Sequence, residues 1–205
     1  MSDIERNAIV IGVTGGVACG KSEVGRILES MGYRACDADH VAHTLMAKDT
    51  VVFNEIVGFF GKGILSEDGE IYRPALGTII FEDPEKRERL NALVHPPVKR
   101  VIERWILERR AQGENGAVQI PLLFESGMND LDFDGIVCVS ASDALVLERL
   151  KKRGMDNEAA TKRIRSQMPL TEKERLSDCV ISNFGSWQEL EEATRQAVKR
   201  LSIER

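Results

Sequence analysis

The sequence is poor in cysteine and in aromatic residues. It has four cysteines and 5% aromatic residues in 205 positions, and no two cysteines stand in the C-x-x-C spacing that zinc and redox sites use. Each thiol stands among apolar or small residues; the four are Cys19, Cys36, Cys138 and Cys179. We therefore expect reduced thiols that pack as small hydrophobic side chains, in a protein of the cytoplasm.

The sequence also lacks an excess of positive charge and a long apolar segment. It has 28 Lys and Arg against 33 Asp and Glu, a formal net charge of -5. No general positive field is available to hold a nucleic acid, so any phosphate must be bound at a local site. Two acidic residues precede the first apolar run, the wrong charge order for a secretory signal. The longest uncharged stretch, Asn7 to Gly20, is too short to span a bilayer and is broken by glycines, so we expect no membrane segment.

What remains is a composition typical of one compact globular chain, with 42% hydrophobic and 30% charged residues. The β-branched run Ala8–Thr14 predicts a strand that is buried on both faces, and a helical pattern follows it from Lys21 to Met31. Further short apolar runs predict strands of the same sheet, at Ala117–Pro121 and Gly135–Val139 and, more weakly, at Tyr33–Cys36 and Cys179–Ser182. Strands that alternate with helices indicate an α/β fold with a doubly wound parallel sheet, whose ligands bind at the carboxyl ends of the strands.

Long helical patterns interrupt this sheet at two places. Between Val41 and Gln112 no convincing strand appears, so we expect a helical subdomain over about 41–114. A basic helical pair with Gly154 at its hinge predicts a lid over about 149–176. The core then comprises about 7–40, 115–148 and 177–205. Four helix starts are marked by capping residues: Asp83 before Pro84, Asp156, and the capping boxes Thr171 with Glu174 and Ser186 with Glu189.

The run Gly15–Ser22 satisfies G-x-x-x-x-G-K-[ST] between a predicted buried strand and a predicted helix, which is the context that a phosphate loop requires. Together with the parallel sheet it predicts a three-layer core of the P-loop NTPase type. Lys21 is expected to reach the β- and γ-phosphates, and the Ser22 hydroxyl to complete the shell of Mg²⁺. The candidate ATP-binding residues of the loop are Gly15, Gly16, Val17, Ala18, Cys19, Gly20, Lys21 and Ser22.

Motifs that are missing narrow the function of this loop. No N-K-x-D string reads a guanine base, and no predicted strand ends in the acidic residue that motor ATPases use to position water. A phosphoryl-transfer enzyme that acts on a bound hydroxyl needs only a cradle, a metal, an acceptor-side carboxylate and cations. We therefore expect a kinase.

Two carboxylates follow the second predicted strand. Asp37 and Asp39 are expected at the carboxyl edge of the sheet, and in an extended segment they would point to opposite sides. One is expected to face the acceptor hydroxyl, whereas the other caps the next helix or contacts metal-bound water. An ordinary capping pair is the alternative interpretation.

Several other polar residues are weaker candidates. Arg149 and Arg153 lie four apart on one helical face, either as cations that close over phosphates or as a solvated basic face. Arg73 and His95, the latter followed by Pro96, either contact substrate or fix loop geometry. His40 and His43 have no third ligand in sight, and the acidic run Asp130–Gly135 is better interpreted as a turn into a strand than as a calcium loop.

Taken together, these residues resemble the dephospho-coenzyme A kinase family over nearly the whole chain. The resemblance rests on Gly15–Ser22, on Asp37-Ala38-Asp39 with His43, on Asp68-Gly69 followed by Arg73, and on His95-Pro96. It continues through Pro121-Leu122-Leu123-Phe124-Glu125, Arg149 with Arg153, Gln167, and Asp178 through Asn183.

The resemblance implies ATP-dependent phosphorylation of the ribose 3′-hydroxyl of dephospho-CoA, with Mg²⁺ as cofactor, and a CoA-binding role for the helical insertion. It implies that Asp39 is the acceptor-side base, that Arg149 is the lid cation over the transferring phosphate, and that Thr14 is close to the reacting centre. Arg153 and Asn183 would lie at ATP. The substrate-binding residues it implies are Asp37, Asp39, His43, Arg73, His95, Leu122, Leu123 and Glu125.

Two positions depart from the pattern of many members of the family. Val146 stands where many have Gln, and Gln119 stands where many have an acidic residue. Other interpretations remain: a nucleoside or nucleoside-monophosphate kinase shares the core and the lid, and a non-catalytic ATP-binding protein shares the loop. The sequence leaves open whether the protein is a monomer or a small homo-oligomer.

Overall fold

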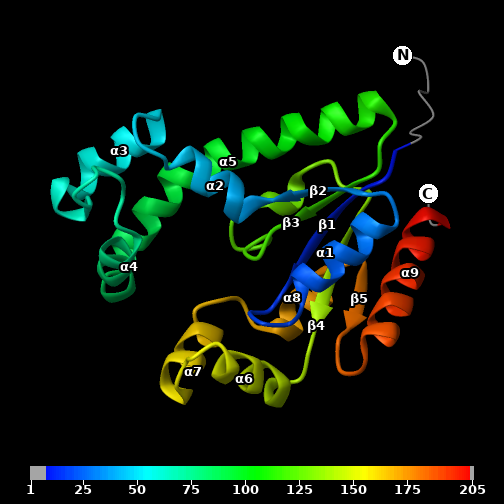
Figure 1. Ribbon diagram of the computed structural model, residues 1–205. Coiled ribbons are helices and arrows are strands. Elements are labelled where there is room, and N and C mark those ends of the chain that lie inside the picture. Colours follow the sequence, from blue (N-terminus) through cyan, green and yellow to red (C-terminus); the bar gives the residue numbers. More distant parts are fainter. Residues whose placement is uncertain (1–7, 204–205) are drawn as a thin grey trace. The chain divides into compact units, whose positions relative to one another are not determined.

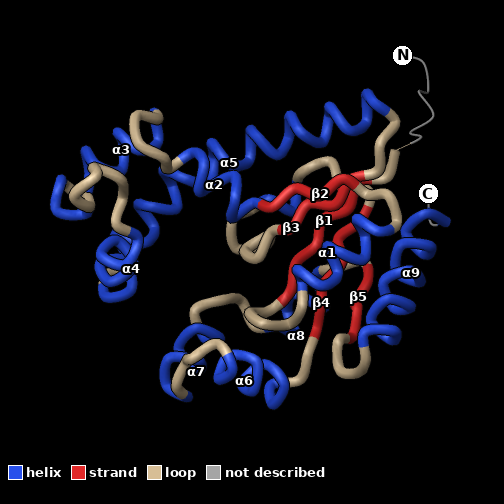
Figure 2. Tube along the Cα trace, in the orientation of Figure 1, coloured by secondary structure: helices blue, strands red, loops and turns tan. Residues whose placement is uncertain are grey.

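The computed structural model describes residues 8–203. The first residues, whose acidic side chains spoke against a secretory signal, lie outside this range. The described chain divides into two compact units, which comprise 8–37 with 105–203 and Ala38–Arg104. Figures 1 and 2 show the chain and its elements.

A five-stranded parallel sheet forms the centre of the first unit, in the order β2-β3-β1-β4-β5 (Figure 2). Its strands are β1 (Val10–Gly15), β2 (Arg34–Asp37), β3 (Gly116–Gln119), β4 (Gly135–Ser140) and β5 (Cys179–Ser182). All five predicted strands are therefore confirmed, with shifts at their ends. Every residue of β1 and of β4 is buried, as the continuous apolar runs predicted.

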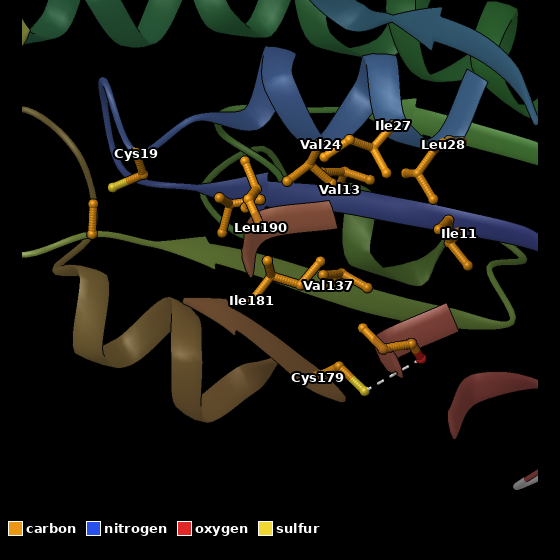
Figure 3. Close-up of a cluster of buried hydrophobic side chains, with 14 of the residues drawn as sticks. Ile11, Val13, Cys19, Val24, Ile27, Leu28, Val137, Cys179, Ile181 and Leu190 are labelled. Atoms are coloured by element: carbon orange, nitrogen blue, oxygen red, sulfur yellow. Dashed lines mark hydrogen bonds between the residues drawn. The ribbon is translucent and has the colours of Figure 1, made fainter. Parts of the chain in front are cut away.

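Helices cover both faces of this sheet. On one face, Ile11 and Val13 of β1 pack against Val24, Ile27 and Leu28 of α1 (Lys21–Ser30), as Figure 3 shows. The helix α9 (Trp187–Ile203) contributes to the same hydrophobic cluster through residues such as Leu190. Successive residues of a strand face opposite sides of the sheet. Gly12, between Ile11 and Val13, therefore faces the other side, where Leu123 and Phe133 fill the space above it. The predicted three-layer α/β core is therefore confirmed.

Three further helices of the first unit lie between β4 and β5 in the chain. They are α6 (Asp143–Lys152), α7 (Asn157–Arg165) and α8 (Leu170–Leu176). Gly154 lies between α6 and α7 with a φ of +84°, which agrees with the predicted glycine between two basic helices. Asp156 caps α7 by accepting the Ala159 N–H at 2.8 Å, and Ser186 and Glu189 form the predicted capping box of α9.

The predicted capping box at Thr171 and Glu174 is wrong. Helix α8 already begins at Leu170, and the preceding residue, Pro169, provides no side-chain cap. Glu174 instead accepts a hydrogen bond from the Ser140 hydroxyl at 2.5 Å, at the end of β4. The Glu174 carboxylate therefore binds a residue of another element, Ser140, and not the backbone at the start of its own helix.

The second unit is helical. It contains α2 (Ala38–Leu45), α3 (Val51–Phe60), α4 (Arg73–Glu82) and most of α5 (Pro84–Gln112), with short 3₁₀ turns at Lys62–Ile64 here and at Met128–Asp130 in the first unit. Asp83 accepts the Lys86 N–H at 3.1 Å before Pro84, which confirms the predicted helix start. No helix within residues 8–203 is long and apolar enough to cross a membrane.

The four cysteines are free and buried, as expected. Burial raises the pKa of Cys36 to about 11 and that of Cys138 to about 12, so both stay protonated at neutral pH. The Cys179 Sγ lies 4.0 Å from the Ala197 carbonyl oxygen (Figure 3). All four thiols therefore act as small hydrophobic side chains.

Candidate active site

The phosphate loop runs from the end of β1 to the start of α1, and its backbone requires glycine at both ends. Gly15 has a φ of +143°, and a Cβ there would lie 2.2 Å from the Val139 carbonyl oxygen. Gly20 has a φ of +107°, and a Cβ there would lie 2.0 Å from the Asn183 Nδ2. At Gly15 both the backbone angle and the fixed backbone of β4 exclude a side chain, whereas at Gly20 the backbone angle is what favours glycine, because the Asn183 amide is the end of a side chain.

The side chains of the loop are arranged for an anion. The Lys21 Nζ donates to the Gly15 and Gly16 carbonyl oxygens at 2.9 and 2.7 Å, so the ammonium is folded over the loop. Ser22 is exposed in the first turn of α1, where the positive end of the helix dipole lies. Ala18 adopts a φ of +56°, a strained angle for a residue with a side chain.

Three side chains from distant parts of the chain close around this loop. The Asn183 Nδ2 donates to the Cys19 carbonyl oxygen at 2.8 Å, and the Arg149 Nη1 donates to the Ala18 carbonyl oxygen at 3.1 Å. The Val17 N–H donates to the Gln167 Oε1 at 3.1 Å. The resemblance placed Asn183 near ATP and Arg149 over the transferring phosphate, but the sequence analysis gave Gln167 no role at the loop.

A pocket of about 340 Å³ opens beside the loop. Residues of the phosphate loop, of α1, of the end of α6 and of the segment that leads into α9 line it, many of them polar or charged. They are Ala18, Gly20, Glu23, Arg149, Lys152, Arg153, Asn183, Gly185, Ser186, Trp187 and Leu190. Trp187 is 46% exposed, and the Arg26 guanidinium lies 5.8 Å from its ring centroid. The pocket therefore brings Arg153 and Asn183, which the resemblance assigned to ATP, together with Arg149, which it assigned to the transferring phosphate, and adds Trp187, which the sequence analysis missed. The capping box at Ser186 predicted the start of a helix here but gave no signal for a pocket.

Cys19 lies inside the loop but is not poised as a nucleophile. Burial raises its pKa, and the nearby Lys21 charge offsets this only in part. A protonated thiol is a weak nucleophile.

The carboxyl ends of the strands bring further predicted residues to the same edge of the sheet. Asp37 is the last residue of β2 and pairs in register with Gln119 of β3, which in turn pairs with Val13 of β1. The next residue of β1, Thr14, is completely buried, and its hydroxyl donates to the Pro121 carbonyl oxygen at 3.4 Å.

The expected extended segment through the two aspartates is wrong. Helix α2 begins at Ala38, so Asp37 ends a strand and Asp39 lies in the first turn of a helix. Their orientations are therefore set by two different elements, and not by the alternation of one strand. Asp39 is exposed and belongs to the second unit, whereas Asp37 belongs to the first.

The segment after β3 carries three of the predicted substrate-binding residues. Leu123 is completely buried and fills the space above Gly12, whereas Leu122 is half-buried. The Glu125 Oε1 lies 2.8 Å from the Lys173 Nζ and accepts the Met168 N–H at 2.9 Å. Lys173 is completely buried. The sequence analysis gave Lys173 no role, and its spacing of three from Leu170 and from Leu176 is a weak signal of burial, because Leu176 is itself 41% exposed.

The two departures from the family pattern have structural surroundings of their own. Val146 is buried in the hydrophobic cluster through α6. Gln119 lies against α1, where a Cβ at Gly25 would come within 2.4 Å of its Nε2. Both positions therefore act in packing within the first unit.

The second unit has a pocket of its own, of about 440 Å³. It brings together His43 of α2 and Arg73, the first residue of α4, with Met46, Ala47, Glu70, Ile71 and Pro74. His95 does not line it. His95 and Pro96 lie within α5, so the expectation that they fix the geometry of a loop is wrong. Partial burial lowers the pKa of His95.

Comparison with known proteins gives a consistent result. The family model described as dephospho-CoA kinase matches residues 9–189. The chain is 42% identical to a dephospho-CoA kinase of Carboxydothermus hydrogenoformans, over 92% of this chain and 90% of the relative, and 40% identical to one of Bacillus cereus, over 95% and 98%. Among solved structures, a Thermus thermophilus protein aligns with a TM-score of 0.78 at 31% identity, and the dephospho-CoA kinase of Campylobacter jejuni aligns with 0.69 at 27%. Each of these alignments covers 95% of this chain and 98% of the other.

Proposed function

This chain belongs to the dephospho-CoA kinase family, and on that premise we propose that its own residues transfer the γ-phosphoryl group of ATP to the ribose 3′-hydroxyl of dephospho-CoA. The observation that carries the proposal is the glycine-bounded phosphate loop with Lys21 folded over it, in a chain that matches the family from residue 9 to residue 189. The products are CoA and ADP.

On the donor side, the loop amides and Lys21 bind the phosphates of ATP. The Lys21 ammonium exchanges its two carbonyl partners for phosphate oxygens, which carry more negative charge. The pocket lined by Asn183, Arg153 and Trp187 takes the adenosine end. An exposed indole beside a pocket suits the flat face of a base, because aromatic rings stack on one another.

Mg²⁺ fits the residues at this site. The Ser22 hydroxyl is an exposed oxygen ligand at the end of the loop, and Mg²⁺ commonly takes one or two protein oxygens, with nucleotide phosphates and water supplying the rest. When bound, Mg²⁺ neutralises part of the charge on the phosphate oxygens. Either Asp37 or Asp39 orders the water around it.

On the acceptor side, Asp39 accepts the proton of the ribose hydroxyl as the hydroxyl oxygen attacks the γ-phosphorus and ADP leaves. The proposal is supported by an exposed carboxylate two residues after the carboxyl end of β2. The pocket with His43 and Arg73 holds part of dephospho-CoA, because a guanidinium suits its phosphate oxygens. His95, Leu122 and Glu125 complete the acceptor side, and Leu123, which is completely buried, supports Leu122 from the core.

Arg149 is proposed to carry its charge over the γ-phosphoryl group as this group moves. It is supported by two hydrogen bonds that already hold the guanidinium at the loop, to Ala18 O and, at 3.4 Å, to Asn183 O. In this proposal the segment 149–176 acts as a lid and the helical insertion of about 41–114 binds CoA. We further propose a cytoplasmic enzyme, monomeric or a small homo-oligomer, with no nucleic-acid or membrane partner; the free cysteines support a reducing compartment.

The test is an assay of ADP release with ATP, Mg²⁺ and dephospho-CoA, run beside AMP, adenosine and a reaction with no acceptor. We expect turnover with dephospho-CoA that exceeds turnover with the other acceptors. The position of the new phosphate is then read by phosphorus NMR, and a product phosphorylated elsewhere than at the 3′-oxygen would contradict the proposal. Faster turnover of AMP or adenosine would indicate a nucleotide or nucleoside kinase.

A further inference from the structure

Lys173 combines a charge with complete burial. Within residues 8–203 it is the one buried lysine or arginine, with 0% of its surface exposed. Its Nζ donates to the Pro121 carbonyl oxygen at 2.6 Å and lies 2.8 Å from the Glu125 Oε1. A buried ion pair is a poor way to gain stability, because apolar side chains of the same size often serve equally well. The reason for a charged residue at this position is therefore sought in the groups that Lys173 contacts.

Both partners belong to the candidate active site. The Pro121 carbonyl oxygen also accepts the hydroxyl of Thr14, at 3.4 Å, so one oxygen receives hydrogen bonds from Lys173 and from the residue before the phosphate loop. The Glu125 Oε1 also accepts the Met168 N–H, at 2.9 Å. The buried ammonium thus fixes a carbonyl and a carboxylate that each hold a second group.

The effect extends to the phosphate loop through the segment before α8. Met168 is held by Glu125, and its neighbour Gln167 accepts the Val17 N–H of the loop, at 3.1 Å. Two consecutive residues therefore link the Glu125 carboxylate to the loop backbone. Helix α8 adds a further tie, because Glu174 accepts the Ser140 hydroxyl at the end of β4.

We propose that Lys173 is a positioning residue for phosphoryl transfer. Its ammonium holds the Pro121 carbonyl and the Glu125 carboxylate, and through them it sets Thr14 and the Gln167–Met168 segment against the phosphate loop. The inference rests on the proposed function, since the transfer is the reaction that this arrangement would serve. An error of position of about 1 Å at reacting groups costs about 100-fold in rate, so such a residue acts on kcat without contacting substrate.

The test compares Lys173→Met with Lys199→Met, a matched substitution at an exposed lysine of α9. For Lys173→Met we expect kcat with dephospho-CoA to fall about 10- to 100-fold while the Kd for ATP stays within about threefold. Hydrogen exchange of the free protein should become faster in 122–128 and 167–168, and remain unchanged in β1 and β4. Lys199→Met should leave all three measurements at wild-type values.

A second variant covers the case in which Lys173→Met does not fold. Glu125→Gln keeps the shape of a partly exposed side chain and removes the charge that faces the ammonium. It should show the same loss of kcat with the same local rise in exchange. Where both variants fold, kcat of the double variant should be no lower than kcat of the more impaired single variant, because the two residues act as a unit.

Several outcomes would overturn the inference. A kcat at the wild-type value in Lys173→Met would overturn it. If Lys173→Met does not fold, a kcat at the wild-type value in Glu125→Gln would overturn it. So would faster exchange across the whole sheet with a parallel loss of ATP binding, since this indicates a structural role alone. A wild-type protein that does not phosphorylate dephospho-CoA refutes the proposed function instead, and the exchange measurement on the free protein keeps the two failures apart.

Discussion

Replacing Gly15 by alanine tests how the end of β1 shapes the phosphate loop. The φ of +143° is costly for alanine, and the added Cβ would lie 2.2 Å from the Val139 carbonyl oxygen and 3.0 Å from the Val139 nitrogen. These are backbone atoms of β4, which pairs with β1 on one side and with β5 on the other. Neither atom can move aside as the end of a flexible side chain would.

The magnitude follows from adding two contributions. An unfavourable backbone angle costs about 1–3 kcal/mol, and forcing extra atoms into a packed site costs about 1–3 kcal/mol more. We therefore expect Gly15→Ala to lower the free energy of unfolding by about 4 kcal/mol, a large part of the stability of a domain. The displaced loop should also bind ATP more weakly.

Gly32→Ala is the matched control. Its φ is +88°, and no heavy atom lies within 4 Å of a Cβ built there. This variant should therefore show the cost of the backbone angle alone, about 1–2 kcal/mol. Urea unfolding of the two variants and the wild type, followed by circular dichroism, measures the difference. Equal losses in the two variants would refute the argument from contact with Val139.

Three further predictions concern the acceptor side, the lid and the inserted unit. Asp39→Asn should lower kcat by about 100- to 10,000-fold with the Kd for ATP unchanged, because a general base acts on the acceptor while the loop binds the donor; turnover measured beside calorimetry checks this, and wild-type turnover would remove Asp39 from the mechanism. Arg149→Ala should lower kcat more than it weakens nucleotide binding, since its charge acts most strongly in the transition state; equal losses in the same two assays would indicate ground-state binding. Because the pKa of His95 is lowered in the folded protein, the unfolded chain binds a proton at this residue at a higher pH than the folded chain does. The contribution of His95 to the free energy of unfolding should therefore be constant above about pH 6.5 and fall as the pH drops below it. His95→Gln should reduce that fall in urea titrations at pH 7.5 and 5.5, and an unchanged slope between the two would contradict the assignment.

Much of the core was predictable because its signals are local. A strand buried on both faces needs an uninterrupted apolar run, and Ala8–Thr14 and Gly135–Val139 both have one. The phosphate loop was predictable for a similar reason, because its glycines and Lys21 must follow one another in a fixed order to build the cradle. The helix starts at Asp156 and Ser186 also depend on residues only a few positions apart.

The predictions that went wrong concern the partner of a side chain or the end of an element. Thr171 and Glu174 have the spacing of a capping box, but the Ser140 hydroxyl, 34 positions away, takes the Glu174 carboxylate. At Asp37 and Asp39 the pattern gave no sign of where the strand would stop, and the helix begins one residue after Asp37. The ends of strands and helices are the part of an element that a local pattern defines least well.

The sequence by itself determined the class of chemistry of this protein, through the residues of the phosphate loop and the membership of a kinase family. The tertiary structure alone decided what surrounds that chemistry. The contacts of Val17 with Gln167 and of Arg149 with Ala18 join residues 150 and 131 positions apart, and Lys173 reaches Pro121 across 52. Such contacts leave no periodic trace in the sequence, because they depend on where whole strands and helices pack and on which charges that packing buries.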